Sequence, residues 1–234
     1  MPAGRDAAGG EKDAGCTGGA DAGKTSEEIL AILAEVYHGA GTALIFHSPY
    51  QLLAATALAA QTTDAQVNKV TPSLFASYPD PQSMAGVAPE TLEPYIKSLG
   101  FYRTKAKNLA AMAEMLVTDF GGEVPGTREE LVKLPGVGRK TANVVLAFAF
   151  GVPAIAVDTH VFRVSRRMGL AEGKTPDEVE RQLCGLIPEK DWGAAHHWLI
   201  WHGRRCCKAQ RPECEECPVG QICPRINIQM NKRK

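Results

Sequence analysis

Two glycines and a proline lie within ten residues near the middle of this chain, in Leu134-Pro135-Gly136-Val137-Gly138-Arg139-Lys140-Thr141-Ala142-Asn143. A helix predicted over Thr127–Leu134 leads into this stretch, and an apolar helix predicted over Val144–Phe150 follows it. Glycine adopts positive φ without steric cost and proline donates no backbone hydrogen bond, so a tight turn is expected between the helices. Free backbone N–H groups at the start of the second helix form an anion site, for which a DNA phosphate is a natural ligand.

Lys140 falls in the first turn of the second helix. The positive end of the helix dipole disfavours an ammonium there, so a partly buried Lys140 would more readily populate its neutral amine. A neutral amine is a nucleophile that can form a Schiff base. The simpler interpretation is a solvated lysine that touches phosphate, and this stretch alone favours that simpler interpretation.

The rest of the chain predicts helices and no sheet. Residues 1–24 are rich in Gly, Ala, Asp and Lys without apolar periodicity, which predicts a disordered tail containing a single thiol, Cys16. Thr25-Ser26-Glu27-Glu28 resembles a capping box that opens the first helix. Ser48-Pro49 is expected to start the next one. Because no alternating strand pattern and no Asn-Gly hairpin occurs, the sequence predicts an all-α fold.

Two further polar positions lie at predicted helix ends. Asp158, in Val157-Asp158-Thr159-His160, precedes a predicted helix over Thr159–Met168 and is well placed to be its N-cap. Gln61 ends a buried apolar helix, where a capping or solvent contact is the simplest role. The loop Ser98-Leu99-Gly100-Phe101-Tyr102 carries two aromatic rings, which either pack on the core or insert into a base stack.

Four cysteines near the C-terminus indicate a metal centre. Cys207, Cys214, Cys217 and Cys223 are separated by six, two and five residues, in a segment too short and polar to build its own core. Four thiolates suit either zinc or an iron–sulfur cluster, and one close pair with two longer arms favours the bulkier cluster. The spacing does not choose between Cys207 and its neighbour Cys206.

Composition limits the remaining possibilities. The 234 residues carry 26 basic and 26 acidic side chains, so bulk charge does not identify a partner. The C-terminal region is nevertheless locally basic, as a nucleic-acid-binding surface would be. With no membrane-length apolar run and no secretory segment, we expect a cytoplasmic protein, in which clustered cysteines are not disulfides.

Together these segments resemble the endonuclease III family of DNA repair glycosylases, within the helix-hairpin-helix, glycine/proline-rich-loop, aspartate superfamily. The resemblance runs from about residue 26 to residue 223. It depends on Ala60-Gln61-Thr62-Thr63-Asp64, on the Leu134–Asn143 stretch, on Val157-Asp158-Thr159-His160 and on the cysteine run. Each segment is moderately specific, and all of them in this order are very specific.

The resemblance implies a bifunctional enzyme that removes oxidised pyrimidines from duplex DNA and then cleaves the abasic strand. Lys140 would be its nucleophile and Asp158 its catalytic aspartate. One 4Fe-4S cluster would be held by Cys207, Cys214, Cys217 and Cys223, with Cys206 a bystander.

The resemblance also implies two helical domains that flank a DNA-binding cleft. Residues 42–152 would form a six-helix barrel domain that contains the helix-hairpin-helix (127–150). Residues 25–41 and 153–234 would form a discontinuous cluster domain, with the cluster loop at 207–223. We expect a monomer that acts in the nucleoid.

Nine residues are expected at the DNA on the same grounds: Gln61, Phe101, Leu134, Gly136, Val137, Gly138, Arg139, His160 and Arg204. Gln61 would fill the gap left by the flipped base. Phe101 departs from the family, which commonly has leucine as its wedge residue at this position.

Three other classes compete with this interpretation. A monofunctional glycosylase of the same superfamily shares the hairpin, aspartate and cluster, but typically lacks a lysine at position 140. A non-catalytic iron–sulfur DNA-binding or redox-sensing protein needs neither Lys140 nor Asp158. A zinc-dependent DNA-binding module is the third alternative, and visible absorption separates it from a cluster protein.

Overall fold

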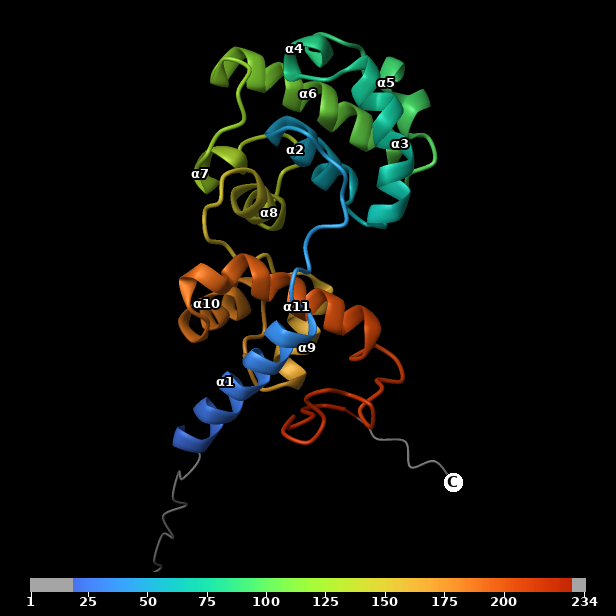
Figure 1. Cartoon of the computed structure of the whole chain (residues 1–234). Helices are drawn as coiled ribbons and strands as arrows, with labels where there is room; N and C mark the ends of the chain where they lie inside the picture. Colours follow the sequence, from blue (N-terminus) through green and yellow to red (C-terminus); the bar gives the residue numbers. More distant parts are fainter. Residues whose placement is uncertain (1–18, 229–234) are drawn as a thin grey trace, which may run out of the picture.

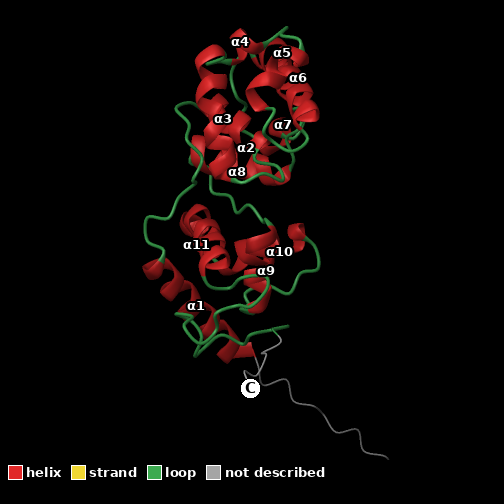
Figure 2. Cartoon of the chain, turned by 90° about the vertical axis from the view of Figure 1, so that its right-hand side faces the viewer, coloured by secondary structure: helices red, strands yellow, loops and turns green. Residues whose placement is uncertain are grey.

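The computed structural model describes residues 19–228, and within that range it contains helices and loops but no strand. The all-α prediction is therefore confirmed. The helices form two groups placed end to end, α2–α8 in one and α1 with α9–α11 in the other (Figures 1 and 2). The elements are α1 (Gly19–Val36), α2 (Pro49–Leu58), α3 (Asp64–Ser77), α4 (Pro81–Met84), α5 (Pro89–Ile96), α6 (Tyr102–Phe120), α7 (Arg128–Leu131), α8 (Arg139–Ala149), α9 (Thr159–Arg167), α10 (Pro176–Leu186), the 3₁₀ turn η1 (Glu189–Asp191) and α11 (Trp192–Arg205).

Each group of helices has its own hydrophobic core. The first core, here called the hairpin core, draws its buried side chains from Leu44 to Ala154. The second, here called the cluster core, combines buried side chains of α1 with those from Ile155 to Val219. Segments from the two ends of the sequence therefore lie side by side, with α1 packed against α11. Two separately packed cores define two helical domains.

Several helix ends differ from those expected. Helix α1 begins at Gly19, so Thr25-Ser26-Glu27-Glu28 lies inside the helix and the predicted capping box is wrong. The predicted disordered tail over 1–24 is also wrong from residue 19 onward, because α1 extends back to Gly19. Residues 1–18 of that tail, with Cys16, lie outside the described residues.

The hairpin helices differ in length from the prediction. Helix α7 is a single turn, Arg128–Leu131, capped by the Thr127 side chain, whereas α8 starts five residues before Val144. The Ser48 N-cap of α2 is confirmed, since its side chain accepts a hydrogen bond from the Gln51 N–H. Among the helices of residues 19–228, none has the length and apolarity needed to span a membrane.

Candidate active site

The turn between α7 and α8 is held by two apolar anchors and one glycine. Leu134 and Val137 are buried in the hairpin core, and the Val137 N–H donates to the Leu134 carbonyl at 3.1 Å. The sequence suggested that the backbone N–H groups of this turn are free. The N–H of Val137 is not free, because it is used within the turn. Gly136 has φ +78°, and a Cβ there would lie 2.8 Å from Nδ2 of Asn108. Only glycine therefore lets the turn rest against α6.

The N-terminus of α8 is open to a ligand. Its N-cap, Gly138, has no side chain to accept from the first amides. Within residues 19–228, the N–H groups of Gly138, Arg139 and Lys140 make no hydrogen bond. Neighbouring helices are capped by side chains, those of Ser48, Thr63, Thr127, Asp158 and Thr175. Unpaired amides at the positive end of a helix dipole form a binding site for an anion such as phosphate.

Beside this helix end, one cavity joins Lys140 to Asp158. It has a volume of about 290 Å³ and lies between the two cores. Its wall also includes Gln61, Asp64 and Arg204. This volume is large enough to admit a flipped pyrimidine base. The cavity thus brings together residues that the sequence predicted separately.

Asp158 has one oxygen bound and one available. Oδ1 accepts from the N–H groups of His160 and Val161, each at 2.8 Å, which confirms the predicted N-cap of α9. Oδ2 has no hydrogen-bond partner in the described part of the chain. Since a carboxylate has several acceptor positions, Asp158 can cap α9 and still face a positive charge in the cavity.

Lys140 is exposed and makes no hydrogen bond or ion pair within residues 19–228. The partial burial considered from the sequence is therefore not present in the protein without DNA. Its ammonium can move freely at the cavity wall.

Two buried histidines of α11, His196 and His197, form another wall of the cavity and were not anticipated from the sequence. Burial lowers the pKa of His196 to about 4 and that of His197 to about 3. The ring of His197 packs against Phe148 with centroids 4.7 Å apart. These neutral rings hold α11 against α8. The adjacent His-His pair within the otherwise apolar stretch Trp192–Trp201 was the signal available in the sequence.

We expect His197 to make stability depend on pH. The unfolded chain binds a proton near pH 6.5, whereas the folded chain excludes it until about pH 3. The folded state therefore loses stability as the pH falls below 6.5, by about 1.4 kcal/mol per pH unit from this group. His197→Gln should show a shallower fall in thermal midpoint between pH 6.5 and 5 than the parent protein. The exposed His38→Gln should keep the parent slope, and equal slopes in all three proteins would contradict the prediction.

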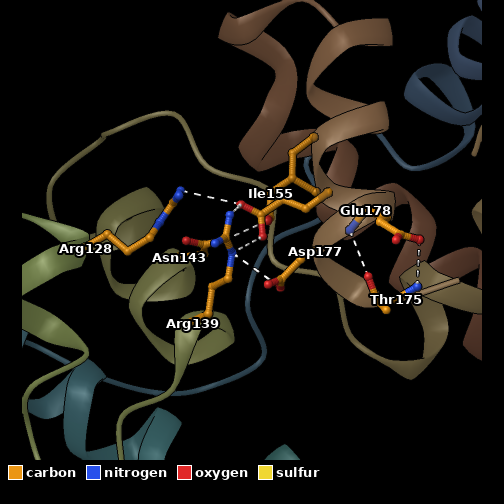
Figure 3. A network of polar contacts seen from close by, with 8 residues as sticks. Arg128, Arg139, Asn143, Ile155, Thr175, Asp177 and Glu178 are labelled. Atoms are coloured by element: carbon orange, nitrogen blue, oxygen red, sulfur yellow. Dashed lines mark hydrogen bonds and ion pairs between the residues drawn. The ribbon is translucent and has the colours of Figure 1, made fainter. Parts of the chain in front are cut away.

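Arg139 and Arg204, both expected at DNA, already have carboxylate partners. The guanidinium of Arg139 donates to both oxygens of Glu180, at 2.8 and 3.0 Å. The guanidinium of Arg128 lies 3.6 Å from the same Glu180 carboxylate. Arg139 also lies 3.6 Å from a second carboxylate, that of Asp177 (Figure 3). These pairs link the hairpin core to α10. Arg204 likewise spans the two cores, with Nη2 3.0 Å from Oδ2 of Asp64.

The other expected DNA residues lie in different surroundings. Gln61 is exposed at the cavity, and Phe101 is exposed over 70 % of its surface outside it. The ring of His160 is half-buried, 3.2 Å from the Arg163 guanidinium and close to Gly203, and it does not line the cavity. His160 thus supports the α9–α11 contact.

The C-terminal loop gathers the four cysteines around one pocket. Cys207, Cys214, Cys217 and Cys223 all line it, and so does the neighbouring Cys206. Gly220 lets the loop close tightly, because a Cβ there would lie 2.5 Å from the Cys214 carbonyl oxygen and 3.0 Å from that of Cys217. The four sulfurs are too widely spread for one small ion, since no three of them lie within 4.8 Å of one another. Four thiols around one pocket at this spacing fit a cluster.

A second set of donors lies at the edge of this pocket. Ligand atoms of His202, Cys206 and Cys217 are within 4.8 Å of one another, a set that would suit zinc if a fourth donor were supplied. The Cys206 thiol instead approaches the Glu213 carbonyl at 3.5 Å. Burial raises the pKa of Cys206 to about 12, and it also raises the pKa of Cys214 and Cys223.

Four side chains that support the loop were missed from the sequence. Arg163 and Arg167, four residues apart on α9, donate to the carbonyls of Cys207 and Lys208 at 3.1 and 2.7 Å. His202 lies with its ring 3.7 Å from the Cys217 sulfur, and its Nδ1 is 3.1 Å from the Tyr37 hydroxyl. The four-residue spacing of the arginines on one face was the available signal.

The unpaired amides at the start of α8 lie beside the cavity that Lys140 and Asp158 line, an arrangement that suits a helix-hairpin-helix protein of DNA base repair. The model of the HhH-GPD superfamily of base excision DNA repair proteins matches residues 54–189. A second family model, that of the iron–sulfur binding domain of endonuclease III, matches residues 207–223. This range begins at Cys207 and ends at Cys223.

Individual relatives agree with both family models. The chain is 51 % identical to the endonuclease III of Bacillus subtilis over 86 % of this chain and 92 % of that one. It is 50 % identical to the endonuclease III of Synechocystis over 84 % of this chain and 90 % of that one. A solved structure described as a trapped endonuclease III–DNA covalent intermediate superimposes with a TM-score of 0.83 at 47 % identity, over 87 % of this chain and 96 % of that chain. The chain belongs to the endonuclease III family.

The resemblance inferred from the sequence is thereby confirmed, together with the class of reaction. The protein is a DNA base-excision repair glycosylase with abasic-site lyase activity, and it holds one 4Fe-4S cluster. Two solved structures that it resembles at 47 % identity are described as complexes of endonuclease III with DNA. The cluster, rather than zinc, is the cofactor of the cysteine loop.

Proposed function

We propose that Lys140 is the nucleophile and Asp158 the assisting carboxylate in the removal of oxidised pyrimidines from duplex DNA. The observation that supports this most strongly is that both residues line one cavity of about 290 Å³, beside the open N-terminus of α8. A base inside a duplex is out of reach, so it must be flipped out before reaction. The free amides of Gly138, Arg139 and Lys140 would bind a phosphate near the flipped nucleotide.

The proposed reaction proceeds through two bond exchanges at the sugar. The neutral Lys140 amine attacks C1′ and forms a new bond to it, while the bond from C1′ to the base nitrogen breaks. The base leaves with the electrons of that bond and takes up a proton. Asp158 stabilises the positive charge that develops on the sugar and orients the amine. The sugar ring then opens at the C1′–O4′ bond to give a Schiff base. This cation acidifies the C2′ hydrogen, and its loss expels the 3′ phosphate by β-elimination. Water hydrolyses the remaining imine and releases Lys140.

Gln61 and Phe101 are proposed to enter the DNA where the base has left. Gln61 lies at the cavity mouth and can fill the vacated position. Phe101 presents the most exposed large apolar side chain of residues 19–228, as a wedge between base steps requires. For Arg139 and Arg204 the ion pairs described above support a role in holding the two cores together, and only the backbone amide of Arg139 is proposed to contact phosphate.

Cys207, Cys214, Cys217 and Cys223 are proposed as the ligands of the cluster. Bound there, the cluster would act as a crosslink that orders a loop with almost no core of its own. We propose domain boundaries that follow the two cores, with residues 42–152 in one domain and residues 25–41 with 153–234 in the other. The enzyme would act on chromosomal DNA in the nucleoid.

Borohydride trapping tests the proposed function directly. The pure protein is mixed with a duplex containing one oxidised pyrimidine and, separately, with a duplex containing an abasic site. Trapping on both is expected, because borohydride reduces the Schiff base to a stable amine. Trapping on the abasic duplex alone would refute the proposed base substrate, and no trapping on either would refute the amine nucleophile.

Asp158→Asn should separate catalysis from capping. Asparagine caps helices about as well as aspartate, so the thermal midpoint should change little. The loss of the negative charge should lower the single-turnover rate of base excision by roughly a hundredfold or more. Thr175→Asn, which changes the cap of α10 away from the cavity, is the control. An active Asp158→Asn protein would show that capping is the only role of this residue.

A further inference from the structure

Two exposed side chains at the DNA-facing side have an unusual backbone conformation. Gln61 has φ +55° and Phe101 has φ +56°, both in the left-handed region that favours glycine. Each such conformation costs roughly 1 kcal/mol or more for a residue with a side chain. It persists only where neighbouring contacts hold it. The loops that carry these residues, 59–63 and 98–102, are about forty residues apart in sequence.

Lys105 connects the two loops. Its Nζ donates to the Thr62 hydroxyl at 2.7 Å, next to Gln61 in the chain. Its own backbone N–H donates to the Phe101 carbonyl at 3.0 Å, in the first turn of α6. A second contact, from the Gln66 amide to the Ser98 hydroxyl at 3.1 Å, links the same two loops further from the cavity. One residue thus contacts both of the strained positions or their immediate neighbours.

Burying the Lys105 amine costs desolvation free energy, which a residue that only fills space would not require. Lys105 is 7 % exposed, and burial lowers its pKa. Among residues 19–228 no carboxylate lies within ion-pair distance of it, so its charge is balanced by no acidic group. It lines a small pocket together with Asn108, Pro135 and Gly136, which places it near the hairpin turn as well. A methionine would fill this space without the cost of desolvating an amine.

We propose that Lys105 is a positioning residue that fixes the separation of Gln61 and Phe101, so that both side chains enter the DNA stack as a rigid pair when the damaged base is expelled. This inference rests on the roles proposed above for Gln61 and Phe101. Without the Lys105–Thr62 contact the loop at 59–63 would relax from its left-handed turn. Base eviction would then slow, whereas the chemistry at Lys140 would continue once a nucleotide is in the cavity.

The test compares Lys105→Met and Thr62→Val with Lys107→Met as the matched control, an exposed lysine two residues further along α6. Single-turnover rates are measured on a duplex with a paired oxidised pyrimidine and on a duplex with a preformed abasic site. Both loop variants should lose about ten- to a hundredfold on the paired lesion and less than about threefold on the abasic site. The control should match the parent protein on both. The double variant should lose no more than either single one, since both remove the same contact.

A fluorescent 2-aminopurine opposite the lesion reports unstacking in the same samples, and its signal should fall in the two loop variants only. Equal losses on both duplexes, a weaker salt dependence of binding, or no loss at all would each overturn the inference. Gln61→Ala and Phe101→Ala distinguish its failure from that of the proposed roles. If these two variants excise the paired lesion normally, the wedge roles are wrong; if they are slow while Lys105→Met is not, only the role of Lys105 is wrong.

Discussion

Lys140→Ala should abolish covalent trapping by borohydride and reduce both base excision and strand cleavage at least about a thousandfold. The reason is chemical, because alanine leaves no amine to attack C1′ or to form the Schiff base. The fold should be unaffected. Lys140 is exposed and makes no hydrogen bond or ion pair within residues 19–228, so the free energy of unfolding should change by no more than about 0.5 kcal/mol.

The control for this prediction is Lys174→Ala, an exposed lysine in the loop before α10. It should trap and cleave as the parent protein does. A Lys140→Ala protein that still formed a covalent complex would assign the nucleophile to another amine. Unchanged affinity of Lys140→Ala for an abasic-site duplex would show that the lysine acts in the reaction and not as a phosphate contact.

Cys217→Ser should remove the visible absorption of the cluster and unfold the loop at 207–223. Within that loop Val219 is the fully buried aliphatic side chain, so the cluster is expected to supply most of its order. Loss of a structural metal centre is among the few changes that cost more than about 4 kcal/mol. For a chain of this size that corresponds to a fall of about 10 °C in the thermal midpoint. Limited proteolysis should cut the loop first, and DNA affinity should fall.

Two cysteine controls make this result specific. Cys184→Ser, in α10 away from the loop, should retain the absorption and thermal midpoint. Cys206→Ser should retain the absorption as well, because its thiol faces the Glu213 carbonyl. If Cys206→Ser lost the cluster and Cys207→Ser kept it, the proposed ligand set would be wrong by one residue.

The parts of the site that could be predicted from sequence depend on local chemistry. Glycine and proline dictate the turn at 135–138, the spacing of four cysteines indicates a metal centre, and an aspartate before a helix predicts its cap. The start of α1 could not be predicted in the same way. The pattern at Thr25 predicts a helix start, but α1 continues through Gly23 back to Gly19 against the low helix propensity of glycine.

Contacts between the two cores could not be predicted from sequence, because they depend on how the cores pack. Arg139 lies in a motif that predicts DNA contact, yet its guanidinium pairs with Glu180, 41 positions away. Arg204 pairs with Asp64 across 140 positions. No local pattern identifies such partners. Lys105 gave no signal either, since an isolated lysine on an amphipathic helix usually faces solvent.

The division between the two cores has a consequence for how the enzyme matures. Lys140 lies in the domain of the hairpin core, whose residues are all present once residues 44–154 have been synthesised. Asp158 lies in the domain of the cluster core, which is complete only when residues up to Val219 have been synthesised. Because domains generally fold as units during synthesis, the hairpin half would exist for some time with an amine but no carboxylate opposite it. A partly made or broken chain could therefore hold DNA without cutting it. Strand scission would begin only when the last segment, with its metal, had closed onto the first helix.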